Sequence, residues 1–271
     1  MDIFQYDFIQ RAFLVGTFLA IVLPCIGITI VLKRLSMMGE TLAHTSLAGV
    51  TFGLIMGFNP TLCATIYCAV AALGIEILRK RFPQFAEMAI AVILSAGIGL
   101  TAILSSFVKS ASNFQSFLFG SIVAVSDFEL GLIIGVSALV LASSLLLYKE
   151  LFYVAFDETA ARMAGVPVGL VNFIFTILTA VTVSVAARTV GALIVSSLLV
   201  IPVAAAMQLG KSYRGTLIVA VLFSVFTMNA GLYISCLTNT KPGGAVVMLE
   251  IGLLLLFMFW NALKRRSRKK F

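Results

Sequence analysis

About nine runs of apolar residues, each roughly 18 to 25 residues long, follow one another along the chain and constrain its fold more than any other feature. A helix needs about 20 mostly apolar residues to cross the hydrocarbon core of a bilayer, so each run is long enough to span a membrane. The composition agrees, because only 11% of the residues are charged, against about a quarter in soluble domains. A membrane β-barrel would need alternating segments of about ten residues, and these runs do not alternate. The sequence therefore predicts an all-α fold, a polytopic transmembrane helical bundle.

Short connections separate the predicted spans, without a soluble domain between them. The spans cover residues 8–32, 37–58, 61–78, 88–108, 130–148, 168–187, 191–209, 216–236 and 246–263. The first run lacks a basic leader and a small-residue cleavage site, so we expect a retained span and not a signal peptide. The run 114–125 is too short to cross, and we expect it to re-enter the membrane or lie along its surface. Residues 1–271 are thus expected to form a single transmembrane domain.

Basic residues cluster at the ends of the predicted spans. The clusters are residues 33–34, 79–81, 211–214 and 264–270, and with this count of spans all fall on one side of the membrane. Because basic clusters stay on the cytoplasmic side, we predict the N-terminus outside and the C-terminus in the cytoplasm. If the run 114–125 crosses, the second half of this topology inverts. The net charge of +8 then indicates contact with membrane lipids, and no nucleic acid is expected as a partner.

Glu40 and His44 are the candidate metal ligands. His44 is the only histidine, and Glu40 is one of the few acids within an apolar run. Residues four apart share one face of a helix, so both side chains point the same way. A carboxylate with an imidazole suits zinc or manganese, whereas calcium and magnesium prefer oxygen ligands alone. Charged groups in hydrocarbon are costly and mark transport pathways more often than structural contacts.

Two ligands do not complete a metal site, since a closed zinc site has about four. Backbone carbonyls, water, a residue of another span, or Thr41 and Thr45 could supply the remainder, and Glu250 and Asn229 are further polar candidates. A transport site can stay open, because an ion that binds too tightly cannot leave. The alternative is that the carboxylate and the imidazole pair with each other or cap their helix, without contacting a metal.

Gly49, Gly53 and Gly57 form a stripe of small residues on the same predicted span. Such a stripe lets a second helix approach closely. At about 100° per residue, the stripe lies well away from Glu40 and His44. One face of this helix is therefore expected to pack, while another lines a cavity.

The polar connection at 156–167 is predicted to contain a short helix of roughly two turns on the cytoplasmic side. Asp157 can cap its start, and Glu158 complements the positive end of its dipole. Gly165 suits the turn after the helix, and Pro167 prevents its continuation. The residues that this helix is expected to expose are Arg162 and Met163. The segment is either an ordinary loop helix or a contact for another protein.

The chain carries no ATP-binding motif. A P-loop reads G-x-x-x-x-G-K-[ST], and Gly210, Lys211 and Ser212 match its end, but Ala205 stands where the first glycine is required. The segment also follows an apolar span, where a P-loop follows a buried strand. If the chain takes part in ATP-driven transport, the ATP must therefore be hydrolysed by another protein.

Several segments together carry a family resemblance. They are FIQRAF at 8–13, VLKRLS at 31–36, GETLAHTSLAGV at 39–50, FGS at 119–121 and VGALIVSSLLVIP at 190–202. Over nearly its whole length the chain resembles the membrane permease of bacterial ABC transporters that import zinc and manganese, and it looks closest to the zinc branch. The resemblance implies an ABC type II importer-like permease in the plasma membrane, working as a homodimer with a second permease copy over cytoplasmic ABC ATPases. It also implies an extracytoplasmic metal-binding protein that delivers the ion.

The resemblance also assigns roles to residues. The family's acid and histidine on the second span match Glu40 and His44, although the acid there is commonly aspartate. The family's cytoplasmic coupling helix matches 156–167. Its coupling residues would be Asp157, Glu158, Arg162, Met163 and Gly165. The chain is not expected to be an enzyme, and no cofactor is expected to be stably bound. Because the chain has a single histidine, both zinc and manganese stay open as the transported ion.

Three other functions compete with this interpretation. A proton-coupled secondary carrier would use His44 and Glu40 as a proton relay and would work without an ATPase. An intramembrane metalloenzyme would need the H-E-x-x-H pattern, which this chain lacks. A structural membrane protein would leave the intramembrane acid and histidine unexplained. We therefore expect the permease subunit of an ATP-driven importer of a divalent transition metal, with zinc favoured over manganese.

Overall fold

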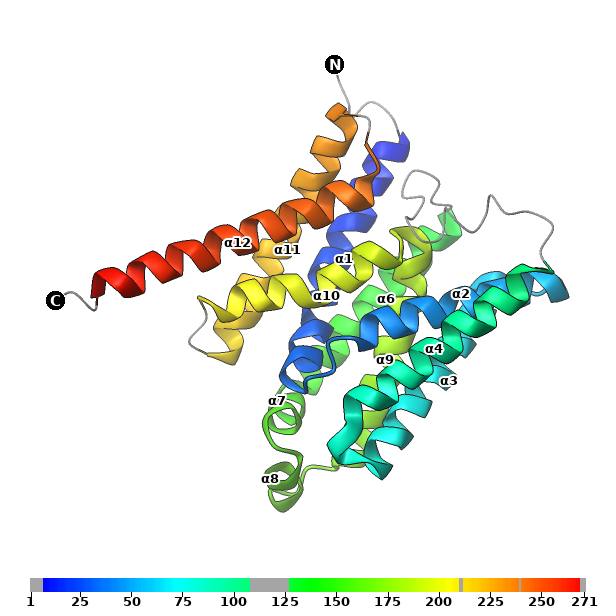
Figure 1. Ribbon diagram of the computed structural model, residues 1–271, viewed down its shortest axis with the longest axis horizontal. Helices are drawn as coiled ribbons and strands as arrows, with labels where there is room; N and C mark the ends of the chain where they lie inside the picture. The colour runs from blue at the N-terminus through cyan, green and yellow to red at the C-terminus, as the bar shows by residue number, and fades with distance from the viewer. Residues whose placement is uncertain (1–6, 108–126, 210–211, 239, 269–271) are drawn as a thin grey trace.

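The computed structural model describes residues 7–107, 127–209, 212–238 and 240–268, and the secondary structure in these ranges is helical throughout (Figure 1). In chain order the elements are α1 (Asp7–Leu32), α2 (Met38–Met56), α3 (Pro60–Arg81), the 3₁₀ turn η2 (Pro83–Phe85), α4 (Ala86–Ser105), α6 (Asp127–Leu146), α7 (Tyr148–Phe156), α8 (Glu158–Met163), α9 (Val168–Thr189), α10 (Ala192–Met207), α11 (Tyr213–Thr238) and α12 (Pro242–Arg268).

Each predicted span coincides with a helix of the structure. Seven helices in the described part of the chain are long and apolar enough to cross a membrane. Two of the predicted spans are not among these seven helices. In α2 the apolar run is interrupted by Glu40 and His44, and α10 has 16 residues. The predicted polytopic helical bundle is therefore confirmed. The short run 114–125, predicted to re-enter the membrane or lie on its surface, falls outside the described residues.

The helices α1 and α9 form the centre of the bundle. In their most apolar stretches, 72% of the α1 residues and 61% of the α9 residues are buried. The peripheral helices are α4, α6 and α12, in which the buried share is 22%, 17% and 17%. In Figure 1, α12 projects beyond the rest of the bundle, and its exposed face carries apolar residues such as Leu255 and Phe259. Apolar exposed faces are expected of helices that lie in lipid.

Glycine permits close helix contacts at a few positions. A Cβ atom on Gly27 of α1 would lie 2.0 Å from the carbonyl oxygen of Leu199 in α10. A Cβ atom on Gly49 would lie 2.6 Å from a backbone oxygen of α3, and Gly53 faces the same helix. Two positions of the predicted glycine stripe therefore pack against α3. At the third, Gly57 ends α2 with φ of 73°, a left-handed conformation that suits glycine.

A tight, hydrogen-bonded turn joins α1 to α2. The Arg34 amide donates to the Val31 carbonyl (3.0 Å) and the Leu35 amide donates to the Ile30 carbonyl (2.9 Å), which are the two hydrogen bonds of a Schellman motif. Arg34 occupies its left-handed position with φ of 58°, and Leu35 is buried. The start of α2 is thereby held in a fixed relation to the end of α1.

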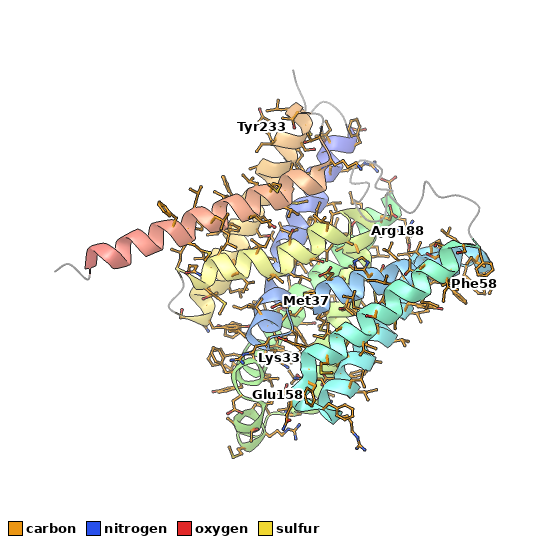
Figure 2. All side chains as sticks on the ribbon, in the orientation of Figure 1. Lys33, Met37, Phe58, Glu158, Arg188 and Tyr233 are labelled. Carbon is orange, nitrogen blue, oxygen red and sulfur yellow. The ribbon has the colours of Figure 1, made fainter. Side chains whose placement is uncertain are left out.

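Three of the four basic clusters lie at one end of the bundle, and the side chains of the fourth, at 264–270, fall outside the described residues. Lys33 and Arg79 both contact Glu158 of α8. Arg214, at the start of α11, lies 5.2 Å from the ring centroid of Tyr148 in α7. Figure 2 shows Lys33 and Glu158 close together at this end, which we call the basic end.

Candidate functional site

Glu40 and His44 line an open pocket between α2 and α10. The pocket has a volume of about 480 Å³, and both side chains are half-buried in its wall. The other lining residues are Ala43 of α2 and Ala192, Leu193, Ser196, Ser197 and Ile201 of α10. The two predicted ligands therefore share one cavity, as their spacing on a helix requires.

The threonines beside these ligands do not reach the pocket. Thr41 and Thr45 are buried, and their hydroxyls donate to the main-chain oxygens of Met37 (3.0 Å) and Thr41 (2.8 Å). Neither belongs to the pocket lining. The two threonines that the sequence offered as further ligands therefore lie outside the pocket.

Ser196 and Ser197 form the polar part of the α10 wall. Their hydroxyls donate to the carbonyls of Ala192 (3.0 Å) and Ile194 (2.9 Å) in the same helix. A hydroxyl has one hydrogen, so each serine oxygen keeps lone pairs for another partner. Sequence reasoning missed these serines as site residues, and the available signal was a pair of adjacent hydroxyls inside an apolar run.

Glu250 and Asn229 do not line the pocket either. Glu250 of α12 is fully buried; Thr227 donates to one carboxyl oxygen at 3.4 Å, and the other has no hydrogen-bond partner in the described part of the chain. The Asn229 side chain accepts from Thr17 of α1 (3.2 Å) and donates to the Val225 carbonyl (2.8 Å). Asn229 therefore makes its polar contacts elsewhere in the bundle, whereas the Glu250 carboxyl group lies behind the pocket wall, next to the Ser197 side chain.

The pocket offers a loose set of metal donors. It contains one carboxylate, one imidazole and two serine oxygens, and no group of three or more histidine, cysteine, aspartate or glutamate side chains gathers among the described residues. Such a set can hold a divalent metal with water in the remaining positions. Loose coordination suits an ion in transit, which must be released again.

At the basic end, α8 has the capped form that the sequence predicts. The Asp157 carboxylate accepts from two amides of the first turn, at 2.8 and 3.1 Å. Gly165 follows the helix with φ of 83°, a left-handed conformation. The side chains of Asp157, Arg162 and Met163 are exposed. The helix itself has six residues, slightly shorter than predicted.

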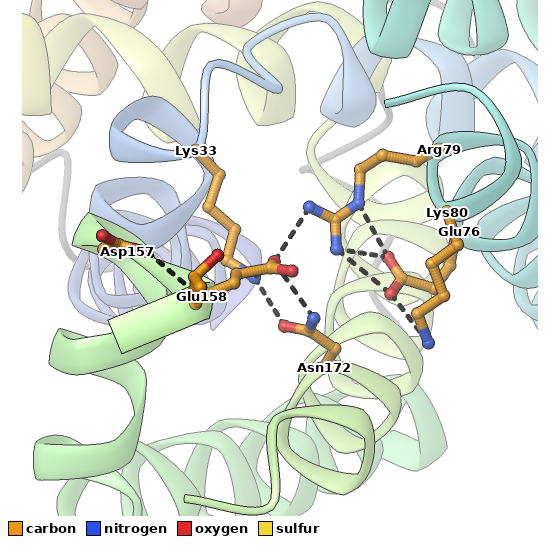
Figure 3. A network of polar contacts seen from close by, with 8 residues as sticks. Lys33, Glu76, Arg79, Lys80, Asp157, Glu158 and Asn172 are labelled. Carbon is orange, nitrogen blue, oxygen red and sulfur yellow. Dashed lines mark hydrogen bonds and ion pairs between the residues drawn. The ribbon is translucent and has the colours of Figure 1, made fainter. Parts of the chain in front are cut away.

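Glu158 instead joins a network of charges inside the basic end (Figure 3). Its Oε1 atom accepts from Lys33 (3.1 Å), Arg79 (2.9 Å) and the side-chain amide of Asn172 (3.1 Å). Lys33 also donates to the Asn172 side-chain oxygen. Glu76 accepts from two guanidinium nitrogens of Arg79 at 3.1 Å each. One carboxylate of α8 is thus bound to α3, to α9 and to the turn after α1.

The neighbouring charges shift the pKa of Glu158. Partial burial alone would raise it, but Lys33 and Arg79 lower the pKa to about 2 from the usual 4.5. Burial also lowers the pKa of Lys33, and the Glu158 carboxylate opposes that change. Glu158 therefore stays ionised under neutral and mildly acidic conditions.

This shift predicts a pH dependence. Because the folded pKa lies below the unfolded value of 4.5, the Glu158 ion pairs stabilise the protein fully above that value and are lost as the pH falls toward about 2. The difference in unfolding temperature between wild type and Glu158→Gln, measured in detergent, should stay constant between about pH 7 and 5 and shrink below about pH 4. A difference that already shrinks in the upper range would show that the carboxylate is not held in this network.

The sequence matches known membrane transport proteins along most of its length. Residues 5–261 match the ABC 3 transport family. A protein of Treponema pallidum described as a "Probable metal transport system membrane protein" is 33% identical over 252 residues, which cover 93% of this chain and 95% of the relative. The manganese transport system membrane protein MntC of Listeria monocytogenes is 33% identical over 245 residues, 90% of this chain and 87% of the relative. The high-affinity zinc uptake system membrane protein ZnuB of Haemophilus influenzae is 25% identical over 257 residues, 94% of this chain and 98% of the relative.

The fold matches as well. A structure of PsaBC from Streptococcus pneumoniae in complex with Fab aligns with a TM-score of 0.83 and 26% identity, covering 93% of this chain and 91% of that chain. The matched region includes α2, α8 and α10, which carry the pocket and the capped helix. The resemblance to zinc and manganese permeases is thus confirmed, and the chain is a multi-pass membrane protein that belongs to the ABC 3 transport family.

Proposed function

We propose that this chain is the permease subunit of an ATP-driven importer that moves a divalent transition metal, Zn²⁺ or Mn²⁺, across the plasma membrane. The observation that carries the proposal is the pocket in which Glu40 and His44 share a cavity with Ser196 and Ser197. Relatives of this chain are named for manganese transport and for zinc uptake. The resemblance to the zinc branch led us to expect zinc, but the manganese relative is 33% identical to this chain and the zinc relative 25%. One imidazole among oxygen donors also suits manganese.

The pocket suggests how the ion passes. Glu40 and His44 would replace part of the hydration shell of an ion that an extracytoplasmic metal-binding protein delivers, and the serine oxygens and water would supply the rest. Because the pocket is open and holds two strong donors, a second copy of the chain would close it at a dimer interface. Alternating access would then release the ion inward.

The basic end is the proposed cytoplasmic face. Its cluster of positive residues supports this orientation, with the N-terminus outside and the C-terminus inside. The exposed side chains of Asp157, Arg162 and Met163 on the capped helix α8 would dock on an ABC ATPase, and Gly165 would fix where that helix ends. Movement driven by ATP would then enter the bundle through α8.

Uptake by liposomes containing the complete transporter tests this function. They should accumulate zinc or manganese, measured by mass spectrometry, only when ATP is supplied on the ATPase side, and collapse of the pH gradient should not change the result. Liposomes with the permease alone are the control and should accumulate neither metal. Uptake by the permease alone, driven by a pH gradient, would contradict the proposal and support a proton-coupled carrier.

A further inference from the structure

We propose that Glu158 is a positioning residue that ties α8 to the helix of the metal pocket, so that a displacement of α8 moves α2. The inference rests on the proposed function, in which α8 receives the movement of an ATPase. It assigns Glu158 a task different from docking, since this side chain contacts the bundle and not the exposed surface of α8.

The first argument is the number of elements that one carboxylate joins. Oε1 of Glu158 accepts from the turn after α1 through Lys33, from α3 through Arg79 and from α9 through Asn172, all within 3.1 Å. The Lys33 and Arg79 side chains are 6% and 15% exposed. Water screens charges at such sites less than at the surface, so these contacts hold more firmly than an exposed ion pair.

The second argument is that α8 has few other attachments. It has six residues, and Ala161 is the one that is buried. A helix this short is not stable by itself and takes its position from tertiary contacts. The Glu158 contacts are therefore a main part of what holds α8 against the bundle.

The third argument is a short, rigid path from Glu158 to the pocket. Lys33 lies within the Schellman turn, in which the Leu35 amide donates to the Ile30 carbonyl at 2.9 Å. The Met38 amide then donates to the Leu35 carbonyl at 2.8 Å, which fixes the first turn of α2. Glu40 lies two residues further along α2. A displacement of Lys33 would thus move the start of α2, and with it Glu40, through the hydrogen-bonded backbone.

A second path runs through α3. Arg79 stays attached to its own helix because Glu76, three residues earlier, binds its guanidinium group. The same helix α3 packs closely along α2 at Gly49 and Gly53. Both paths from Glu158 therefore end on α2, the helix that carries the metal ligands.

The test is the ratio of metal uptake to ATP hydrolysis in the reconstituted complete transporter. Glu158→Gln keeps the size of the side chain and removes its charge, and it should lower the metal transported per ATP roughly tenfold while hydrolysis continues. Lys33→Met interrupts the path through Lys33 alone and should give a smaller loss. The double variant should be no worse than Glu158→Gln, because that substitution already weakens both paths. Glu87→Gln, an exposed acid at the start of α4, is the matched control and should transport normally.

The outcomes separate the two proposals. Unchanged uptake per ATP in Glu158→Gln, or fully additive losses in the double variant, would overturn the link through Glu158 while ATP-driven uptake by wild type still stands. Equal losses of uptake and hydrolysis would also overturn it, since they would mean that the residue serves general stability. If wild type shows no ATP-dependent uptake, the proposed function itself fails.

Discussion

Replacing His44 by alanine is expected to reduce metal uptake by roughly 100-fold, with the protein still inserted in the membrane. His44 is the only imidazole in the chain, and it lines the pocket half-buried beside Glu40. If His44 binds the ion directly, as proposed, its removal should reduce uptake at least as much as removal of a residue that contacts a metal ligand, for which losses of 10- to 100-fold are typical. The measurement is cellular zinc and manganese content by mass spectrometry, in metal-limited medium and at matched protein levels.

Glu40→Gln should have a similar effect, because it preserves the shape of the side chain and removes the negative charge that attracts a cation. Ser196→Ala removes one hydroxyl oxygen from the opposite wall and should give a smaller loss. Thr45→Val is the control, since its buried hydroxyl bonds within the helix. If both ligand variants keep normal metal content, Glu40 and His44 form a structural pair and the pocket is not the metal path.

Replacing Gly27 by alanine is expected to prevent α1 and α10 from packing. The added carbon would lie 2.0 Å from the Leu199 carbonyl oxygen and 2.9 Å from the carbonyl carbon. These are backbone atoms, which cannot turn aside as a flexible side chain can. Overpacking usually costs about 1–3 kcal/mol, and a backbone clash at the centre of the bundle should reach or exceed the upper value. Thermal unfolding and the yield of folded protein in detergent would measure the loss.

Gly99→Ala provides the matched control for this substitution. Gly99 is exposed in the middle of α4, and an added Cβ would meet nothing within 4 Å. Alanine is the better helix former there, so the variant should be unchanged or more stable by about 0.5–1 kcal/mol. If Gly27→Ala unfolds at the same temperature as Gly99→Ala, the close approach of α1 and α10 is not as described.

Much of the fold could be predicted because the bilayer imposes a strong length rule on helices. Apolar runs gave the long helices and their approximate bounds, and turn residues marked several ends. Asn59 caps α3, accepting from the Thr61 amide at 3.0 Å, and Pro60 is the first residue of that helix. Asp157 and Gly165 bracket α8 in the same way. These signals are local, so they can be read from the sequence.

The contacts between helices could not be predicted in the same way. In lipid every face of a span can be apolar, so the sequence does not show which face of α10 meets α2, nor that Ser196 lies on that face. The partners of Glu158 are 125 and 79 residues away along the chain, at Lys33 and Arg79. From the sequence, the only interaction that we predicted for the Glu158 carboxylate was with the dipole of its own helix. Assigning its true role required the tertiary arrangement.

The central position of α1 also has a consequence for biosynthesis. This helix leaves the ribosome long before its neighbours α10 and α11, which lie far later in the sequence. At about 5–20 residues per second, α1 waits roughly 10–40 s in the membrane before the end of α11 is made. Throughout that time the surface around Gly27 has no α10 to pack against, and the Thr17 hydroxyl lacks the Asn229 side chain that it contacts in the finished protein. In a chain whose synthesis stops before α10, the face of α1 that is buried in the finished protein would therefore be exposed to lipid. Such a chain would also be open to the proteases that degrade unassembled membrane proteins.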